Sequence, residues 1–131
     1  IRYLSHKNVK LNITAVYTTR QTIKIIRNLN KKTKSIISIF AGRMSDVGKD
    51  PVPIFRKCVK LSKKYNKIKI LWASTREPYN FIQANQIGCD IITMPAGVIE
   101  KVLKFGKSFQ SLTIDTVKKF LIDSEESNFK L

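Results

Sequence analysis

Short apolar runs alternate along the chain with longer amphipathic stretches. The runs are rich in β-branched residues and are bounded by polar turns, a pattern typical of strands buried on both faces. They cover residues 11–17, 36–40, 68–73 and 90–94. Because a helical pattern follows each run, the strands are expected to lie parallel to one another. The sequence therefore predicts an α/β fold.

Helix boundaries can be located between these runs. Thr18 and Gln21 have the spacing of a capping box, Asp50 precedes Pro51 as a cap does at a helix start, and Gly88 is placed to end a helix. Helices are expected at residues 1–5, 18–29, 50–65, 75–88, 95–106 and 111–125, and a loop at 41–50. The predicted order is strand and helix four times over, followed by a terminal helix.

Two architectures fit this order. Each strand–helix unit is about as long as a unit of a (β/α)₈ barrel, in which eight units take ~250 residues. The chain could therefore supply half a barrel, or it could form a small open doubly wound sheet. Length alone favours the open sheet. The start at Ile1 rather than Met, and the lack of any GxGxxG or GxxxxGK[ST] sequence, favour half a barrel that belongs to a longer polypeptide.

Composition points to a folded domain with an excess of positive charge. The chain has 131 residues, 43% of them hydrophobic, with 25 Lys+Arg against 9 Asp+Glu and a formal net charge of +16. Such a charge favours nucleic-acid or acidic-membrane binding. However, the lysines are scattered along the chain, and no basic stripe is interleaved with aromatic residues. Solvated helix faces explain them better, so nucleic acid is not an expected partner, and no apolar run is long enough for a membrane span.

The cysteines and the histidine limit the possible chemistry. Cys58 and Cys89 have no motif spacing, which indicates buried thiols in a reducing compartment such as the cytoplasm. His6 is the one histidine, which argues against a Ser/His/Asp triad and against a histidine-rich metal site. Neither a metal nor a cofactor is expected.

Polar residues follow two of the predicted strands directly. Arg43 comes just after the second apolar run, and Ser74 and Arg76 come just after the third. The carboxyl ends of parallel strands share one edge of a sheet, where α/β proteins bind ligands. A single arginine in a loop is usually a solvated charge, but two guanidiniums and a hydroxyl at adjoining strand ends suit a phosphate group.

Polar residues also interrupt the first two strands. Asn12 and Thr14 are two residues apart, so both are expected to point to the same face of the first strand. For the same reason Ser38 and Phe40 are expected to point to one face of the second strand. A buried Asn beside a buried Thr is costly unless both are hydrogen-bonded, which favours a binding role. Simple structural explanations stay open for three of them: Thr14 favours a strand, Ser38 fits a tight core and Phe40 fills one.

Four segments together resemble one protein family. They are similar to the fifth to eighth strands of transaldolases and fructose-6-phosphate aldolases. The four segments are Leu-Asn-Ile-Thr-Ala at 11–15, Ile-Ser-Ile-Phe-Ala-Gly-Arg at 37–43, Trp-Ala-Ser-Thr-Arg at 72–76 and Gly-Cys-Asp-Ile-Ile-Thr-Met-Pro at 88–95. They occur in the family's order. The resemblance implies a (β/α)₈ TIM barrel of transaldolase type, of which residues 1–131 form the C-terminal half of a single domain.

The resemblance also assigns roles. It implies that Thr14 orients a water for proton transfer, that Asn12, Ser38 and Phe40 contact the substrate, and that Arg43, Ser74 and Arg76 bind its phosphate. The family's Schiff-base lysine on the fourth strand, and its acidic residues on the first and third, would precede Ile1. Residues 1–131 alone are therefore expected to be inactive.

The implied activity is transfer of a dihydroxyacetone unit between sugar phosphates, as in the pentose phosphate pathway. Phe40 favours this transfer, because the aldolase branch typically has Tyr there. An aldolase that releases dihydroxyacetone is the first alternative, and a non-catalytic module that binds sugar phosphate or nucleic acid is the second. Expected partners are the sugar phosphate, the N-terminal half of the barrel, and a second copy of the protein, on which residues 124–131 would pack as in the short aldolases.

Overall fold

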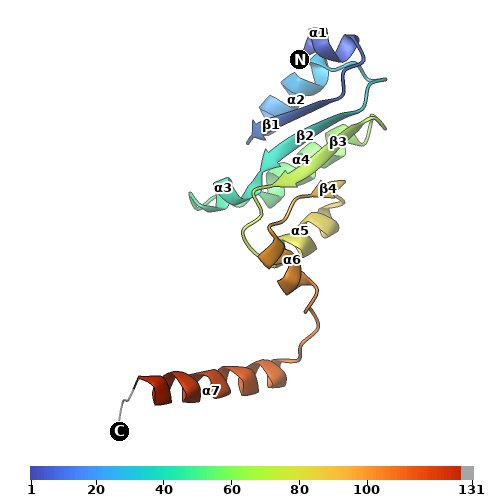
Figure 1. Cartoon of the computed structure of the whole chain (residues 1–131). Coiled ribbons are helices and arrows are strands. Elements are labelled where there is room, and N and C mark those ends of the chain that lie inside the picture. The colour runs from blue at the N-terminus through green and yellow to red at the C-terminus, as the bar shows by residue number, and fades with distance from the viewer. Residues whose placement is uncertain (128–131) are drawn as a thin grey trace.

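A computed structural model, which describes residues 1–127, shows one parallel four-stranded sheet (Figure 1). The strands are β1 (Leu11–Val16), β2 (Ser35–Phe40), β3 (Ile68–Ala73) and β4 (Ile91–Ile92), paired in the order β1-β2-β3-β4. The helices are α1 (Arg2–His6), α2 (Thr19–Asn28), α3 (Ala41–Ser45), α4 (Val52–Ser62), α5 (Tyr79–Ile87), α6 (Ala96–Val102) and α7 (Phe109–Glu126). The predicted parallel α/β order is confirmed.

The predicted boundaries at Thr18 and Gly88 are confirmed. Helix α4, however, begins one residue later than predicted, with Pro51 as its N-cap, and α6 ends at Val102 rather than near Gly106. The Thr18 hydroxyl accepts the Gln21 N–H at 3.1 Å, and the Gln21 side chain accepts the Thr18 N–H at 2.9 Å, which completes the capping box of α2. An Asp50 carboxylate oxygen accepts the Val52 N–H at 2.9 Å at the start of α4. Gly88 ends α5 in the left-handed conformation, with φ 73°.

The core lies between the sheet and one layer of helices. The side chains of Ile37, Ile39, Ile70 and Trp72 point into it and are fully buried. Phe55 of α4 stacks on Trp72 with ring centroids 4.3 Å apart. Each such side chain contributes about 1.5–3 kcal/mol through burial, so this layer holds the strands in register.

The opposite face of the sheet carries no helix within residues 1–127 (Figure 1). Alternate residues of the strands point there, and some of them line an open hollow of about 510 Å³: Asn12, Ile36, Lys69 and Ile91. A doubly wound sheet has helices on both faces and a strand order that reverses. Sequential strands with helices on one face are instead the wall of a β/α barrel.

Several details differ from the sequence-based expectations. Residues 41–45, expected in a loop, form α3 directly at the end of β2. β4 has only two residues, Ile91 and Ile92, where a strand was expected over residues 90–94. In β1 the register shifts between Ile13 and Val16, where Ala15 has φ 58°. This irregularity breaks the strict alternation of side chains in that strand.

Helix α7 stands apart from the sheet (Figure 1). None of its described residues is buried, and Phe109 at its start is 89% exposed. Further apolar side chains along it are exposed as well: Leu112, Ile114, Val117, Phe120, Leu121 and Ile122. Residues 128–131, part of the segment expected to pack on a neighbouring copy, lie outside the described residues.

Candidate anion site at the carboxyl ends of the strands

The second and third strands end side by side. Phe40 is the register partner of Ala73, so α3, which follows Phe40, begins beside Ser74. Arg43 therefore lies on α3, next to the β3–α5 connection that carries Ser74 and Arg76. The prediction that these residues share one edge of the sheet is confirmed at the level of the backbone.

Arg76 leans on α3. Its guanidinium donates to an Asp46 carboxylate oxygen at 2.6 Å, and both side chains are about half exposed. A guanidinium has five N–H donors, so one carboxylate leaves others available for a ligand. Asp46 had no predicted role, and no sequence signal links two residues thirty positions apart.

Arg43 lies over an aromatic pair. Its guanidinium carbon is 5.8 Å from the centre of the Phe40 ring, and Phe40 meets Tyr17 edge to face at 5.9 Å. Contact with an aromatic face restrains an arginine while leaving its donors exposed. Tyr17 ends the first apolar run and was not predicted to take part.

Ser74 occupies a backbone conformation that side chains rarely adopt. Its φ is 62°, in the left-handed region, and its side chain is half-buried. A non-glycine residue there costs of the order of 1–2 kcal/mol, and such residues cluster at functional sites. The bend turns the chain sharply from β3 toward Arg76.

The substrate-contact candidates of β1 and β2 are only partly brought together. The Ser38 hydroxyl donates to the Asn12 side-chain oxygen at 2.6 Å. This bond joins neighbouring strands on the helix-free face. Asn12 and Thr14, however, line different hollows, and the register of β1 shifts between Ile13 and Val16. Thr14 lies beside Gln21 of α2 in a hollow of about 460 Å³ at the free edge of β1.

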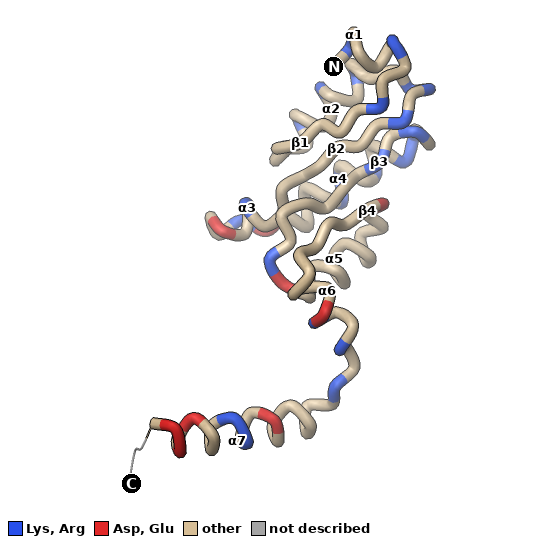
Figure 2. Tube along the Cα trace, in the orientation of Figure 1, with Lys and Arg blue, Asp and Glu red and all other residues tan. Residues whose placement is uncertain are grey.

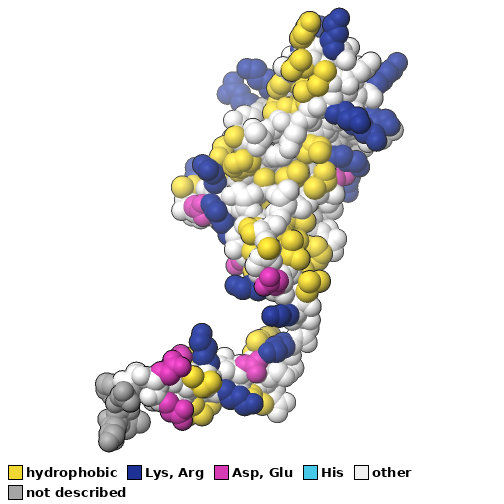
Figure 3. Space-filling view, in the orientation of Figure 1, with side chains coloured by type: hydrophobic (Ala, Val, Ile, Leu, Met, Phe, Trp, Pro, Cys, Tyr) yellow, Lys and Arg dark blue, Asp and Glu magenta, His cyan; other side chains and the backbone are white. Residues whose placement is uncertain are grey.

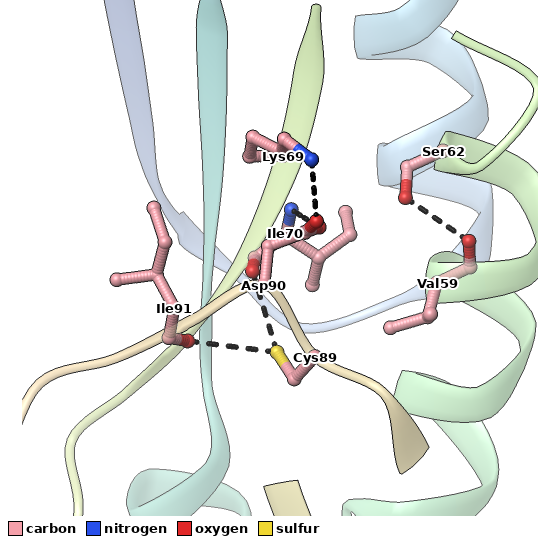
Figure 4. Close-up of polar contacts among 7 residues, drawn as sticks. All are labelled: Val59, Ser62, Lys69, Ile70, Cys89, Asp90 and Ile91. Atoms are coloured by element: carbon pink, nitrogen blue, oxygen red, sulfur yellow. Dashed lines mark hydrogen bonds and ion pairs between the residues drawn. The ribbon is translucent and has the colours of Figure 1, made fainter. Parts of the chain in front are cut away.

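The other titratable side chains among residues 1–127 offer no competing centre. Burial raises the pKa of Cys89 to about 11, and its thiol donates to the Ile70 carbonyl at 3.3 Å (Figure 4). Burial also raises the pKa of Cys58, so both thiols are poor nucleophiles at neutral pH. Burial lowers the pKa of Lys31, but this lysine lies at the opposite edge of the sheet, before β2.

The described part of the chain has neither a metal-binding cluster nor a membrane-spanning helix. Residues 1–127 contain no group of three or more His, Cys, Asp or Glu side chains placed to hold a metal ion. Over the same residues, every helix falls short of the length and apolarity needed to cross a bilayer.

The fold defines the wall of a β/α barrel, with Arg43 and Arg76 at the carboxyl ends of its strands. A model of the Transaldolase/Fructose-6-phosphate aldolase family matches residues 1–131, and the chain belongs to that family. Its four βα units are part of the family's (β/α)₈ barrel.

Similar curated proteins support the same conclusion. The chain is 31% identical to a probable transaldolase of Nitrosopumilus maritimus over 94% of its own length and 52% of that protein. It is 30% identical to one of Caldicellulosiruptor saccharolyticus, over 96% of the chain and 55% of the relative. It is 32% identical to a probable transaldolase of Thermoplasma volcanium, over 86% of the chain and 49% of the relative. The chain therefore spans about half the length of the curated relatives it matches.

Proposed function

We propose that the protein to which this chain belongs is a transaldolase that transfers a dihydroxyacetone unit between sugar phosphates. In this proposal residues 1–131 are the C-terminal half of the barrel, and the Schiff-base lysine comes from the preceding half. The observation that carries the proposal is the juxtaposition of Arg43 with Ser74 and Arg76 in a member of this family. A free aldehyde and a free ketone would need no such cationic edge, whereas their phosphate esters do.

Each side chain has a proposed part in that reaction. Arg43 and Arg76 bind the phosphate, each by charge-assisted hydrogen bonds, and the Ser74 hydroxyl adds a neutral donor. The bonded pair Asn12–Ser38 faces the interior of the barrel and contacts the sugar hydroxyls. Thr14 orients a water for proton transfer from the free edge of β1, where the preceding half of the barrel would adjoin it.

The lysine supplies covalent catalysis. Its neutral amine condenses with the ketose carbonyl at C2 and expels water. The resulting protonated imine accepts the electron pair of the C3–C4 bond when that bond breaks, and the C4 hydroxyl gives up its proton as C4 becomes the aldehyde carbon. The aldehyde product leaves, and the three-carbon fragment stays bound until an acceptor aldehyde takes it. Phe40 supports transfer rather than release, because a phenyl ring has no hydroxyl with which to activate water against the bound fragment.

Two surfaces support the proposed partners. The helix-free face of the sheet exposes half-buried Ile36 and Ile91, which the other half of the barrel would cover. The exposed apolar side chains of α7 support packing on a second copy of the protein. We also place the protein in the cytoplasm, because Cys58 and Cys89 are both free thiols.

Borohydride trapping tests the proposed reaction. The whole protein is incubated with fructose 6-phosphate, reduced and analysed by mass spectrometry. A three-carbon adduct on a lysine upstream of Ile1 is expected. Adding a different phosphorylated acceptor aldehyde, erythrose 4-phosphate, before the reductant should remove the adduct from a transaldolase and yield a seven-carbon ketose phosphate. Dihydroxyacetone accumulating without any acceptor would instead indicate an aldolase.

An unmodified protein would support the non-catalytic alternative. That alternative rests on the net charge of +16. It predicts binding of duplex DNA at physiological salt, where electrostatic binding is already weakened. Titration of labelled DNA with the whole protein distinguishes a nucleic-acid module from one that binds sugar phosphate.

A further inference from the structure

Gly42, the second residue of α3, lies against the backbone of the β3–α5 connection. A Cβ built on Gly42 in ideal geometry would lie 1.8 Å from the Ser74 carbonyl oxygen and 2.7 Å from Cγ of Arg76. Both distances are far below van der Waals contact. The close approach of α3 to residues 74–76 therefore requires glycine for steric reasons.

Asn80 holds the same segment from the other side. It is 7% exposed, and its side-chain oxygen accepts the N–H of Arg76 at 3.0 Å and that of Glu77 at 3.3 Å. Its amide nitrogen donates to Gln83 at 2.9 Å, which fixes the orientation of the amide. One buried side chain thus satisfies two backbone donors where the chain turns into α5.

We propose that Gly42 and Asn80 are positioning residues of the anion site. Neither is expected to touch the ligand: Gly42 has no side chain, and the polar atoms of Asn80 are already bonded within the protein. They determine where Ser74 and Arg76 stand relative to Arg43. This inference rests on the proposed phosphate-binding role of those three residues.

The physical reason is preorganisation. Arg76 is long and flexible, so ordering its side chain on binding costs conformational entropy. It contributes more to the affinity for a ligand if the protein already holds it in place. Gly42 lets the stem of Arg76 lie directly on α3, where Asp46 holds the guanidinium. Asn80 fixes the backbone from which that stem begins. Misplacing a binding group by about 1 Å is enough to weaken function by up to about a hundredfold.

Matched substitutions test the proposal in the whole protein. Gly42→Ala is compared with Gly97→Ala, because Gly97 is also the second residue of a helix after Ala and a Cβ there meets no atom within 4 Å. Asn80→Ala is compared with Asn85→Ala, an exposed position on the same helix α5. Folding of each variant is checked by circular dichroism.

Two readouts separate positioning from general damage. Calorimetry gives the affinity for inorganic phosphate, and kinetics give kcat and KM for glyceraldehyde 3-phosphate and for glyceraldehyde as acceptors. We expect Gly42→Ala to weaken phosphate binding and raise KM for the phosphorylated acceptor about tenfold or more, and Asn80→Ala about threefold to tenfold. Values for unphosphorylated glyceraldehyde, and all values for the two control variants, should stay within about twofold of wild type.

The outcomes distinguish this inference from the function on which it rests. If Arg43→Ala and Arg76→Ala weaken phosphate binding but folded Gly42→Ala and Asn80→Ala do not, the positioning role is wrong and the proposed site stands. If the arginine variants bind phosphate as wild type does, both proposals fall. Equal losses with both acceptors would also overturn the inference, because they indicate general damage. Should Gly42→Ala not fold, Asn80→Ala decides.

Discussion

Positively charged side chains lie at both ends of the strands (Figure 2), but the two edges of the sheet are built differently. At the amino ends of the strands, Lys10, Lys34 and Lys67 directly precede the register partners Leu11, Ser35 and Ile68. Neighbouring strands lie ~4.8 Å apart, so these lysines form a row across three strands. Figure 2 shows this basic edge where β1, β2 and β3 begin, and Figure 3 shows its side chains projecting into solvent.

At the carboxyl ends the positive groups are fewer and are held in place. Arg76 is held by Asp46 and its backbone by Asn80, and Arg43 lies over the Phe40 ring. In the lysine row, by contrast, Lys10, Lys34 and Lys67 take part in no ion pair with residues 1–127, and only the nearby Lys69 pairs with an acid, Asp90. The comparison teaches that net charge is a poor guide to a site. Restrained donors at a strand end carry more information than a larger number of free ammonium groups.

The largest effect should come from Arg43 at the carboxyl edge. Arg43→Ala should raise KM for glyceraldehyde 3-phosphate in the whole protein about tenfold to a hundredfold, because one charge-assisted hydrogen bond contributes ~1.5–3 kcal/mol. KM for unphosphorylated glyceraldehyde should barely change. The exposed Arg27→Ala of α2 is the control, and an equal effect of that substitution would show that overall charge rather than position matters.

Asp90 offers the sharpest test at the amino edge. Its carboxylate accepts from Lys69 at 2.8 Å and from the Ile70 N–H at 2.9 Å (Figure 4). Asp90→Ala should lower the free energy of unfolding by about 2 kcal/mol, because it leaves a partly buried N–H without its charged acceptor. Urea denaturation measures this. Phosphate binding should stay unchanged, and a loss comparable to that of Arg43→Ala would mean that the two edges are coupled.

Cys89 links stability at this edge to pH. Burial raises its pKa from 9.0 in the unfolded chain to about 11 in the folded protein. The folded state therefore favours the neutral thiol. Its contribution is fully present below about pH 9 and is lost as the pH rises toward 11, with a total on the order of 2 kcal/mol. The unfolding free energy of wild type minus that of Cys89→Ala should fall over this window, and a constant difference would contradict the assignment.

Much of the fold could be predicted from local sequence. The strands follow from runs of β-branched residues, and the boundaries at Thr18, Asp50 and Gly88 follow from side chains that bond within three residues or from a left-handed turn. Helix α3 was missed because five residues are too few to show a helical period. The length of β4 was overestimated, because the apolar run at residues 90–94 pairs with β3 only through Ile91 and Ile92.

The candidate site was predictable only as a set of residue types. Arg43, Ser74 and Arg76 could be placed at strand ends, but the Arg76–Asp46 pair and the contact of Gly42 with Ser74 depend on the register of Phe40 with Ala73. These contacts join residues about thirty positions apart. Likewise, the shared parity of Asn12 and Thr14 assumed a regular strand. The positive φ of Ala15 could not be foreseen, because alanine rarely adopts it.

The smallest effect is expected from the lysine row, although it carries the most charge. Replacing Lys10, Lys34 and Lys67 by Gln should raise the free energy of unfolding by a few tenths of a kcal/mol at low salt, because neighbouring like charges repel. Salt should screen that gain.

The matched control replaces Lys101, Lys104 and Lys118, which lie on or just after α6 and on α7. KM for glyceraldehyde 3-phosphate should stay at the wild-type value in both triple variants. A tenfold rise in the first alone would show that bulk charge at the amino edge attracts the substrate, and the contrast between the edges would then be one of degree.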